Sequence, residues 1–338
     1  MSDRREAIAI VGAGSWGTAL SMVLGEAGRP VRLWARRPEL ALAIRERSRN
    51  PEYLSQYALP TLVQATGAMD EAVSGARLII LAVPSHGMRA VCELLSEYVS
   101  PEQGVVSAAK GLEHETGRRM SEVISESLGR SHRIAVLSGP NLAPGVAKRN
   151  ATVSVAASAD RNFAGEVQST MSTPRFRVYT NTDVLGVELG GVLKNVIAIG
   201  AGIGDGLGFG DNTKAALMTR GLAEMKRLGM ALGARGDTFH GLSGMGDLIA
   251  TCAGRTSRNH QVGYELATGR SLADVLRGMA PQIAEGIETT RAVVRLAASV
   301  GVGMPIAAAV HAVLFEDITP MAAVKSLMTR AWRDELDE

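Results

Sequence analysis

The feature that most constrains the fold is a glycine-rich turn between an apolar segment and a helical pattern. Gly12-Ala-Gly-Ser-Trp-Gly17 follows residues 7–11, which are apolar throughout, and leads into a helical pattern over 15–27. In a strand–turn–helix unit the first glycine permits the tight turn, the second admits a pyrophosphate, and the third lets helix and strand pack closely. The helix N-terminus favours anions. The turn therefore predicts a dinucleotide site, whose contact residues are Gly12, Gly14, Ser15, Trp16 and Gly17.

The rest of the first half alternates short apolar runs with helical patterns. Such strands, apolar on both faces, are typical of a parallel sheet covered by helices on each side. After about Thr180 the strand-like runs end and long helical patterns follow. We therefore predict an α/β protein with an N-terminal Rossmann doubly wound sheet over residues 1–182 and an all-α C-terminal domain over 183–338. The predicted strands are 7–11, 30–35, 78–83, 104–109, 134–137, 152–156 and 176–179.

Composition excludes several classes of protein. The 36 basic and 34 acidic residues give a net charge of +2, which offers no basic face for nucleic acid. Two distant cysteines, Cys92 and Cys252, form no disulfide framework, and six histidines show no metal-ligand spacing, so we expect no metal. The apolar segment 184–203 carries Glu188 and Lys194, which argues against a membrane span. Because no signal peptide is recognisable either, a cytoplasmic protein is expected.

A second glycine-rich stretch runs from Gly200 to Gly210. It follows a helical pattern rather than a strand and lacks the Gly-Lys-Ser/Thr ending of a phosphate-binding P-loop. We interpret this stretch as a tight segment between two helices.

The end of the second predicted strand bears on the choice of nucleotide. Enzymes that use only NAD typically place an acidic residue there for the ribose 2′-hydroxyl. This chain has Arg36 and Arg37, and guanidinium groups can pair with a 2′-phosphate. We therefore predict that NADPH is preferred over NADH. The alternative is a pair of solvated surface arginines.

Several strings of residues point to one family. In chain order they are Gly12-Ala-Gly-Ser-Trp-Gly-Thr-Ala-Leu20, Val83-Pro-Ser-His86, Lys110-Gly-Leu-Glu113, Ser138-Gly-Pro140, Gly190-Gly-Val-Leu-Lys194-Asn-Val-Ile-Ala-Ile-Gly200, Gly246-Asp-Leu248, Ser257-Arg-Asn259 and Glu285-Gly286. With these strings the chain resembles the bacterial NAD(P)-dependent glycerol-3-phosphate dehydrogenases. This resemblance implies a homodimer that reduces dihydroxyacetone phosphate to sn-glycerol 3-phosphate for phospholipid synthesis.

Lys194 is the predicted acid and base. A ketone reduced by hydride needs a proton, and desolvation of a lysine disfavours its charged form and lets it exchange that proton near neutrality. Lys194 interrupts an apolar run, and Gly186, Gly190 and Lys194 are spaced to lie on one helix face. The alternative is a lysine that reaches solvent from a core helix. Asp247, in a glycine-rich turn, is predicted to orient this amine or bind the substrate hydroxyl, unless it is only a helix N-cap.

Lys110 follows a predicted strand at the sheet edge where α/β proteins bind ligands, and there it can stabilise negative charge. The alternative is an ordinary loop lysine. By resemblance, Lys110 contacts both substrate and cofactor, Gly139 and Asn141 contact substrate, and Ala143 contacts the cofactor. Asn141 stands where the family often has Ser or Thr, and an amide keeps donor and acceptor capacity.

Ser257, Arg258 and Asn259 open a predicted helix, and together they make a receptor for a phosphate dianion. Simple capping with a solvated arginine is the alternative. By resemblance, Arg258 also reaches the cofactor, and Ile283 and Glu285 are cofactor contacts. For His86, which also belongs to a family string, we prefer a structural role.

Two other functions fit part of the pattern. A β-hydroxyacid dehydrogenase shares the Rossmann-plus-helices plan and a catalytic lysine, but it does not require a phosphate receptor. A non-catalytic NADPH-binding regulator would explain Gly12–Gly17 and Arg36, but not the joint occurrence of Lys110, Lys194 and Asp247.

Overall fold

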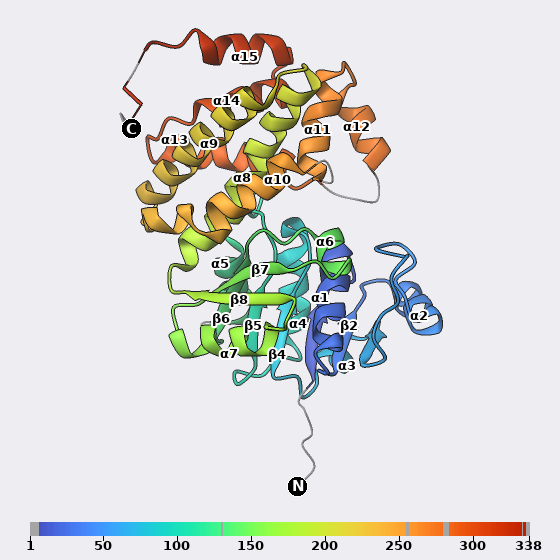
Figure 1. Cartoon of the computed structure of the whole chain (residues 1–338). Coiled ribbons are helices and arrows are strands. Elements are labelled where there is room, and N and C mark those ends of the chain that lie inside the picture. The colour runs from blue at the N-terminus through green and yellow to red at the C-terminus, as the bar shows by residue number, and fades with distance from the viewer. Residues whose placement is uncertain (1–6, 130, 255–256, 280–283, 333, 336–338) are drawn as a thin grey trace. The chain divides into compact units, whose positions relative to one another are not determined.

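The computed structural model describes residues 7–129, 131–254, 257–279, 284–332 and 334–335. Contacts divide the chain into two compact units (Figure 1). The first consists of Met1–Glu113 and Arg118–Val184, and the second of His114–Gly117 and Leu185–Glu338. These units are defined by their internal contacts. The domain boundary at 182/183 stays a prediction. Ile283, predicted as a cofactor contact, lies outside the described residues.

The first unit is built on one sheet of eight strands in the order β3-β2-β1-β4-β5-β6-β7-β8. Two features differ from the prediction. β3 was missed, because Val63-Gln-Ala-Thr66 is short, half polar and at the sheet edge. β7 runs antiparallel to β6, whereas every other pair is parallel. The strands are β1 (Ile8–Val11), β2 (Val31–Trp34), β3 (Val63–Thr66), β4 (Leu78–Leu81), β5 (Gly104–Ser107), β6 (Ile134–Ser138), β7 (Thr152–Ala157) and β8 (Phe176–Asn181).

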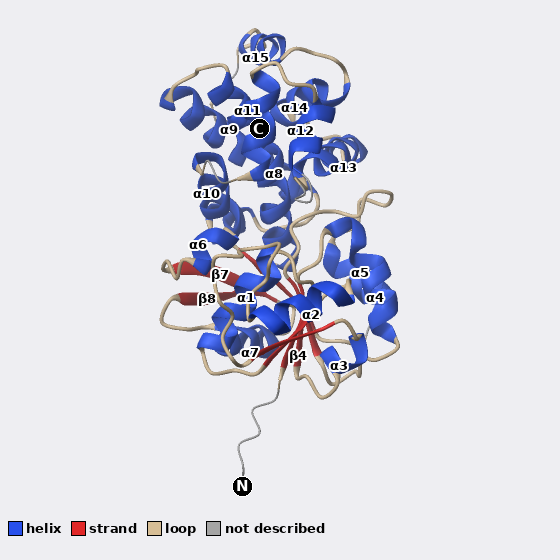
Figure 2. Ribbon diagram, turned by 90° about the vertical axis from the view of Figure 1, so that its right-hand side faces the viewer, coloured by secondary structure: helices blue, strands red, loops and turns tan. Residues whose placement is uncertain are grey.

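Helices cover both faces of this sheet, as Figure 2 shows. In β1, Ile8 and Ile10 face one apolar core, and Ala9 and Val11 face the other. Because both faces are covered, every residue of such a strand is apolar. The helices of this unit are α1 (Ser15–Glu26), α2 (Pro38–Arg47), α3 (Met69–Val73), α4 (Met88–Ser96), α5 (Met120–Leu128), α6 (Ala143–Ala147) and α7 (Arg161–Met171), with the 3₁₀ turn η1 (Ser85–Gly87).

The strand order reverses beside β1, which pairs with β2 on one side and β4 on the other. The chain therefore passes from β1 through β2 to β3 on one side and returns to β4 on the other. At such a reversal the carboxyl ends of the strands line a crevice where doubly wound sheets bind ligands. The glycine-rich turn and α1 begin at this point. The fold thus places the predicted dinucleotide site at the switch point of the sheet.

The described residues of the second unit are helical, apart from connecting loops (Figure 2). The helix α8 (Val184–Gly206) passes through Gly200 and ends at Gly206, so the interpretation of the whole stretch from Gly200 as a segment between helices was wrong. The other helices are α9 (Asp211–Ala231), α10 (Asp247–Ala253), α11 (Arg258–Ala267), α12 (Leu272–Met279), α13 (Gly286–Ser299), α14 (Pro305–Phe315) and α15 (Pro320–Met328), with the 3₁₀ turn η2 (Gly236–His240) and the π turn η3 (Leu242–Gly246).

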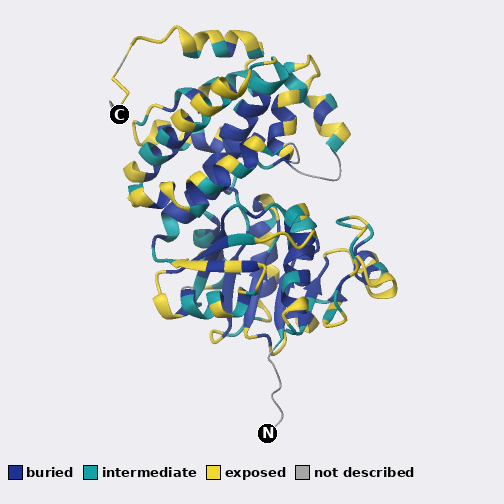
Figure 3. Cartoon of the chain, in the orientation of Figure 1, coloured by how far each residue is buried: buried dark blue, intermediate teal, exposed yellow. Residues whose placement is uncertain are grey.

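The central helix α8 is buried along most of its length (Figure 3). By length and mean hydropathy it is the one helix among the described residues that could cross a membrane, and 78% of its most apolar stretch is buried inside the protein. Its apolar surface is therefore covered by the protein's own side chains. Glu188 and Lys194 lie within this buried stretch.

Candidate functional site

The glycine-rich turn has the backbone geometry that a bound pyrophosphate needs. Gly12 has φ +115°, a conformation that side chains with a Cβ rarely adopt. A Cβ at Gly17 would lie 1.9 Å from the Gly12 carbonyl oxygen, whereas a Cβ at Gly14 would meet no heavy atom within 4 Å. Gly14 is the N-cap of α1, and no side chain caps it. The turn therefore leaves open space at a free helix N-terminus, and these residues fit a dinucleotide.

Asn50 fixes this turn from a distant part of the chain. Its amide is fully buried and donates to the Ala13 carbonyl oxygen at 2.8 Å and to the Thr18 hydroxyl at 2.9 Å. Its oxygen accepts from the backbone of Glu52 and Tyr53. Asn50 thus joins the turn to the segment after α2. The sequence analysis missed it, because a lone asparagine 33 residues past the motif carries no pattern of its own.

The two arginines after β2 have different environments. Arg37 pairs with Glu52, which is itself held by Asn50. Arg36 is exposed, and no hydrogen bond or ion pair of its side chain is found among the described residues. Of the two guanidinium groups, that of Arg36 is therefore the more available for a 2′-phosphate.

Lys110 and Asn141 are brought together at the carboxyl ends of β5 and β6. The Lys110 ammonium donates to the Gly139 carbonyl oxygen at 2.8 Å and to the Asn141 side-chain oxygen at 2.9 Å. The Asn141 amide donates to the Ser154 hydroxyl at 2.8 Å, and Ser154 donates to the Ser138 carbonyl oxygen. Asn141 is 5% exposed. The Asn141 side chain therefore positions the Lys110 ammonium. A serine side chain is shorter and would not reach Lys110 in the same way.

Lys194 lies in the second unit, in a buried polar cluster. Its ammonium is 3.0 Å from the Asp247 carboxylate and donates to the Thr251 hydroxyl at 2.7 Å. Lys194 is 4% exposed and Asp247 is fully buried. A Cβ at Gly190, one turn earlier, would lie 2.6 Å from the Ser243 carbonyl oxygen. The lysine is therefore held in place rather than extended to solvent, which excludes the alternative of a lysine that reaches solvent from a core helix.

Asp247 begins α10, and Thr251 lies one turn later on the same helix. The Thr251 hydroxyl is 2.6 Å from the Asp247 carbonyl oxygen and 3.2 Å from its carboxylate. Side chains four residues apart on a helix are neighbours, so this spacing was the available signal for Thr251, which the sequence analysis missed.

The first turn of α11 carries the predicted phosphate receptor. Ser257 is the N-cap and accepts from the His260 amide at 3.3 Å. Asn259 donates to the Asn195 side-chain oxygen at 2.8 Å and accepts from the Gly286 amide at 3.0 Å. Arg258 is exposed, without an ion pair among the described residues. Asn195, the neighbour of Lys194, was missed as a site residue although it belongs to a quoted string.

The structure gives less support to the roles of three other residues. Ala143 is the first residue of α6 and packs against the core of the first unit. Glu285 is half-buried at the N-cap of α13. His86 is exposed in η1, so burial gives no support to the structural role preferred for it.

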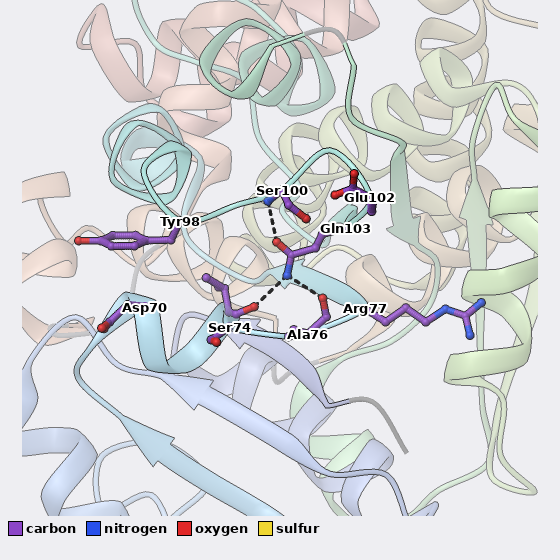
Figure 4. A pocket seen from close by; sticks show the side chains of 10 residues that line it. Asp70, Ser74, Ala76, Arg77, Tyr98, Ser100, Glu102 and Gln103 are labelled. Atoms are coloured by element: carbon purple, nitrogen blue, oxygen red, sulfur yellow. Dashed lines mark hydrogen bonds between the residues drawn. The ribbon is translucent and has the colours of Figure 1, made fainter. Parts of the chain in front are cut away.

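A cavity of about 540 Å³ lies elsewhere in the first unit (Figure 4). Its lining residues precede β4 and β5, so it lies at the amino ends of the strands. Gln103 in its wall donates to the Val73 and Ala76 carbonyl oxygens and accepts from the Ser100 amide. The side chain of Gln103 is thus satisfied within the wall, and the lining contains none of the predicted site residues.

The two groups of residues match two chemical tasks. In the first unit, free amides and an open turn suit a dinucleotide, with Lys110 at the same edge of the sheet. In the second unit, a buried amine bonded to a carboxylate and a hydroxyl suits proton transfer, and the first turn of α11 suits an anion.

Comparisons with known proteins identify the family of both parts of the chain. Residues 7–164 match the family model for the NAD-dependent glycerol-3-phosphate dehydrogenase N-terminus, and residues 183–325 match that for the C-terminus. Glycerol-3-phosphate dehydrogenase (NAD(P)+) 1 of Salinibacter ruber is 49% identical over 97% of this chain and 96% of its own length. The corresponding enzyme of Koribacter versatilis is 48% identical over 96% and 97%.

A solved structure shows the same fold. The crystal structure of glycerol-3-phosphate dehydrogenase from Coxiella burnetii superposes with a TM-score of 0.92 at 37% identity, covering 96% of this chain and 99% of that one. With both family models and near-full-length relatives in agreement, the chain belongs to the NAD-dependent glycerol-3-phosphate dehydrogenase family.

Proposed function

We propose that this protein reduces dihydroxyacetone phosphate to sn-glycerol 3-phosphate with a nicotinamide cofactor, reversibly, and prefers NADPH to NADH. The observation that carries this proposal is the buried cluster of Lys194, Asp247 and Thr251, supported by relatives that bear the name of this activity. Burying the charge of a lysine costs folding free energy, and an ion pair often only offsets that cost. The burial of Lys194 therefore points to a functional role. We further propose that the enzyme is a cytoplasmic homodimer that supplies phospholipid synthesis.

The chemistry follows from the residues. When bound, the reduced nicotinamide supplies the hydride. Lys194 gives a proton from its Nζ to the substrate oxygen that was the carbonyl, and in the reverse direction takes it from the hydroxyl. Asp247 and Thr251 orient the amine through the hydrogen bonds described above. Lys110 stabilises negative charge on the substrate. Ser257, Arg258 and Asn259 bind the phosphate.

The direct test is an assay of the purified protein. Nicotinamide absorbance should fall when dihydroxyacetone phosphate is added with NADPH, and more slowly with NADH. Turnover of 3-hydroxyisobutyrate in preference to the phosphorylated ketone would instead favour a β-hydroxyacid dehydrogenase. Binding of NADPH without turnover of either substrate would favour a non-catalytic regulator.

Arg36→Ala is expected to lower kcat/KM with NADPH by about tenfold or more, because it removes a charged hydrogen bond to the 2′-phosphate. Activity with NADH, which lacks this phosphate, should change little. Arg37→Ala should have a smaller effect, because Arg37 pairs with Glu52. Exposed Arg45 on α2 provides the matched control. Equal losses with both nucleotides would remove Arg36 from 2′-phosphate recognition.

Arg258→Ala is expected to raise KM for dihydroxyacetone phosphate by about tenfold or more, since a guanidinium–phosphate contact is lost. Steady-state kinetics with dihydroxyacetone, which has no phosphate, provide the comparison. The exposed Arg161 of α7 is a suitable control substitution. If both ketones lost efficiency equally, the phosphate would have to bind elsewhere.

A further inference from the structure

The glycine-rich end of α8 forms a direct backbone contact with α11. A Cβ at Gly202 of α8 would lie 1.9 Å from the His260 carbonyl oxygen. A Cβ at Gly263 of α11 would lie 1.9 Å from the Ile199 carbonyl oxygen. No side chain fits between the helices at these points. Gly202, from the glycine-rich stretch between Gly200 and Gly210, therefore serves helix packing.

A polar cluster, in which only His260 is buried, joins the same two helices. The His260 Nε2 atom is 2.8 Å from the Asp205 carboxylate, which also lies 2.8 Å from the Lys214 ammonium of α9. The His260 side chain is 6% exposed. Burial opposes ionisation of Asp205, but hydrogen bonds from Lys214 and His260 outweigh it and lower the pKa of this carboxyl. An ionised carboxylate only accepts hydrogen bonds, so His260 donates from Nε2.

This cluster is connected to the first turn of α11. His260 donates its backbone amide to the Ser257 hydroxyl, and its neighbour Asn259 donates to Asn195. Asn195 directly follows Lys194 on α8. The first turn of α11 is therefore tied to the lysine-bearing helix at two points, through Asn195 and through Asp205.

We propose that His260 and Asp205 are positioning residues that hold the turn Ser257–Asn259 in the conformation that binds the substrate phosphate. The inference rests on the proposed function of that turn. Neither residue contacts the substrate. The glycine contact sets the distance between the helices, and the His260–Asp205 hydrogen bond sets how the first turn of α11 is oriented on α8. Loosening that turn weakens phosphate binding but leaves the Lys194 cluster intact.

The test compares His260→Ala with His260→Gln. Alanine removes the donor to Asp205, whereas a glutamine amide can donate to it. Asp205 keeps its ion pair with Lys214 in both variants, so its carboxylate stays paired. We expect His260→Ala to raise KM for dihydroxyacetone phosphate about tenfold with kcat within about twofold, as for a lost charged hydrogen bond that acts on binding. His260→Gln should recover most of the affinity.

Two comparisons separate positioning from general destabilisation. The KM for dihydroxyacetone and the affinity for NADPH should be unchanged in His260→Ala. His311→Ala, which removes a histidine paired with Glu316 at the end of α14, is the matched control. An unchanged KM for the phosphorylated ketone, an equal loss with both ketones, or no recovery in His260→Gln would each overturn the positioning role. Wild-type protein that fails to reduce dihydroxyacetone phosphate would instead refute the proposed function itself.

Discussion

Lys194→Ala is expected to lower kcat by about 10²-fold or more, because the substitution removes the group that gives a proton to the substrate oxygen. NADPH binding should stay near the wild-type value, since the dinucleotide turn is in the first unit and Lys194 is in the second. Steady-state kinetics and fluorescence titration with NADPH measure the two effects separately. Lys325→Ala, on the exposed surface of α15, is the matched control and should retain full turnover.

The fold of this variant has to be checked, because it removes the lysine that neutralises the buried Asp247 carboxylate. Removing one member of a buried ion pair costs about 3–5 kcal/mol. The double variant Lys194→Met/Asp247→Asn removes both charges and keeps similar volumes. It should fold more stably than Lys194→Ala and be equally inactive. Near-normal turnover in either variant would exclude Lys194 from the mechanism.

Much of this site could be predicted because its residues occur in recognisable local patterns. The turn Gly12–Gly17 combines a motif with a strand before it and a helix after it. Lys194 is conspicuous because a charge interrupts an apolar helix, and the structure pairs it with Asp247, the carboxylate that the sequence suggested. In these cases the residues that identify the role lie within one helix or turn, so the sequence of that segment is enough to predict them.

Other features depend on contacts that no local pattern records. β3 is a short edge strand with one apolar face, so its residues resemble a loop. The antiparallel β7 depends on how the chain turns after β6 rather than on the composition of the strand. Asn50 acts through partners far away in the chain, and amides are common in loops and caps. Nothing in the sequence separates it from an ordinary surface asparagine.

The glycines of α8 show a third kind of difficulty. Glycine disfavours helices by about 1 kcal/mol relative to alanine, so a cluster of glycines predicts that a helix ends. Here α8 continues to Gly206, because α11 packs against it at backbone distance and leaves no room for side chains. Tertiary packing therefore overrides the local preference, and only the neighbouring helix reveals why.

Stability of the second unit should fall as pH rises from about 5 to about 8, because of Glu224 of α9. Its carboxylate is 3% exposed and accepts from the backbone amides of Ile306 and Ala307, at 2.7 and 3.3 Å. It thereby caps the N-terminus of α14, whose own N-cap residue, Met304, supplies no side-chain cap. Burial raises the pKa of Glu224 to about 7, although these amides and the nearby Arg227 and Arg330 oppose the shift.

The direction of this pH dependence follows from the protons that the folded and unfolded states bind. Between the usual glutamate pKa of 4.5 and the folded value of about 7, the folded state keeps a proton that the unfolded state has released. Stability is therefore greatest below this window and is lost as pH rises through it, by about 3 kcal/mol. Glu224→Gln cannot ionise, yet its amide oxygen can still accept from Ile306. Urea unfolding monitored by circular dichroism should show a flatter pH dependence for this variant over the window.

Other groups titrate in the same range, so the informative quantity is the difference in unfolding free energy between wild type and Glu224→Gln at each pH. The stability of the variant relative to wild type should increase as pH rises, because only the wild type must bury a charge above the pKa of Glu224. Glu39→Gln, an exposed carboxyl on α2, should leave the wild-type slope unchanged. A difference between wild type and Glu224→Gln that stays constant with pH would mean that Glu224 is ionised at every pH tested, and that the α14 amides outweigh its burial.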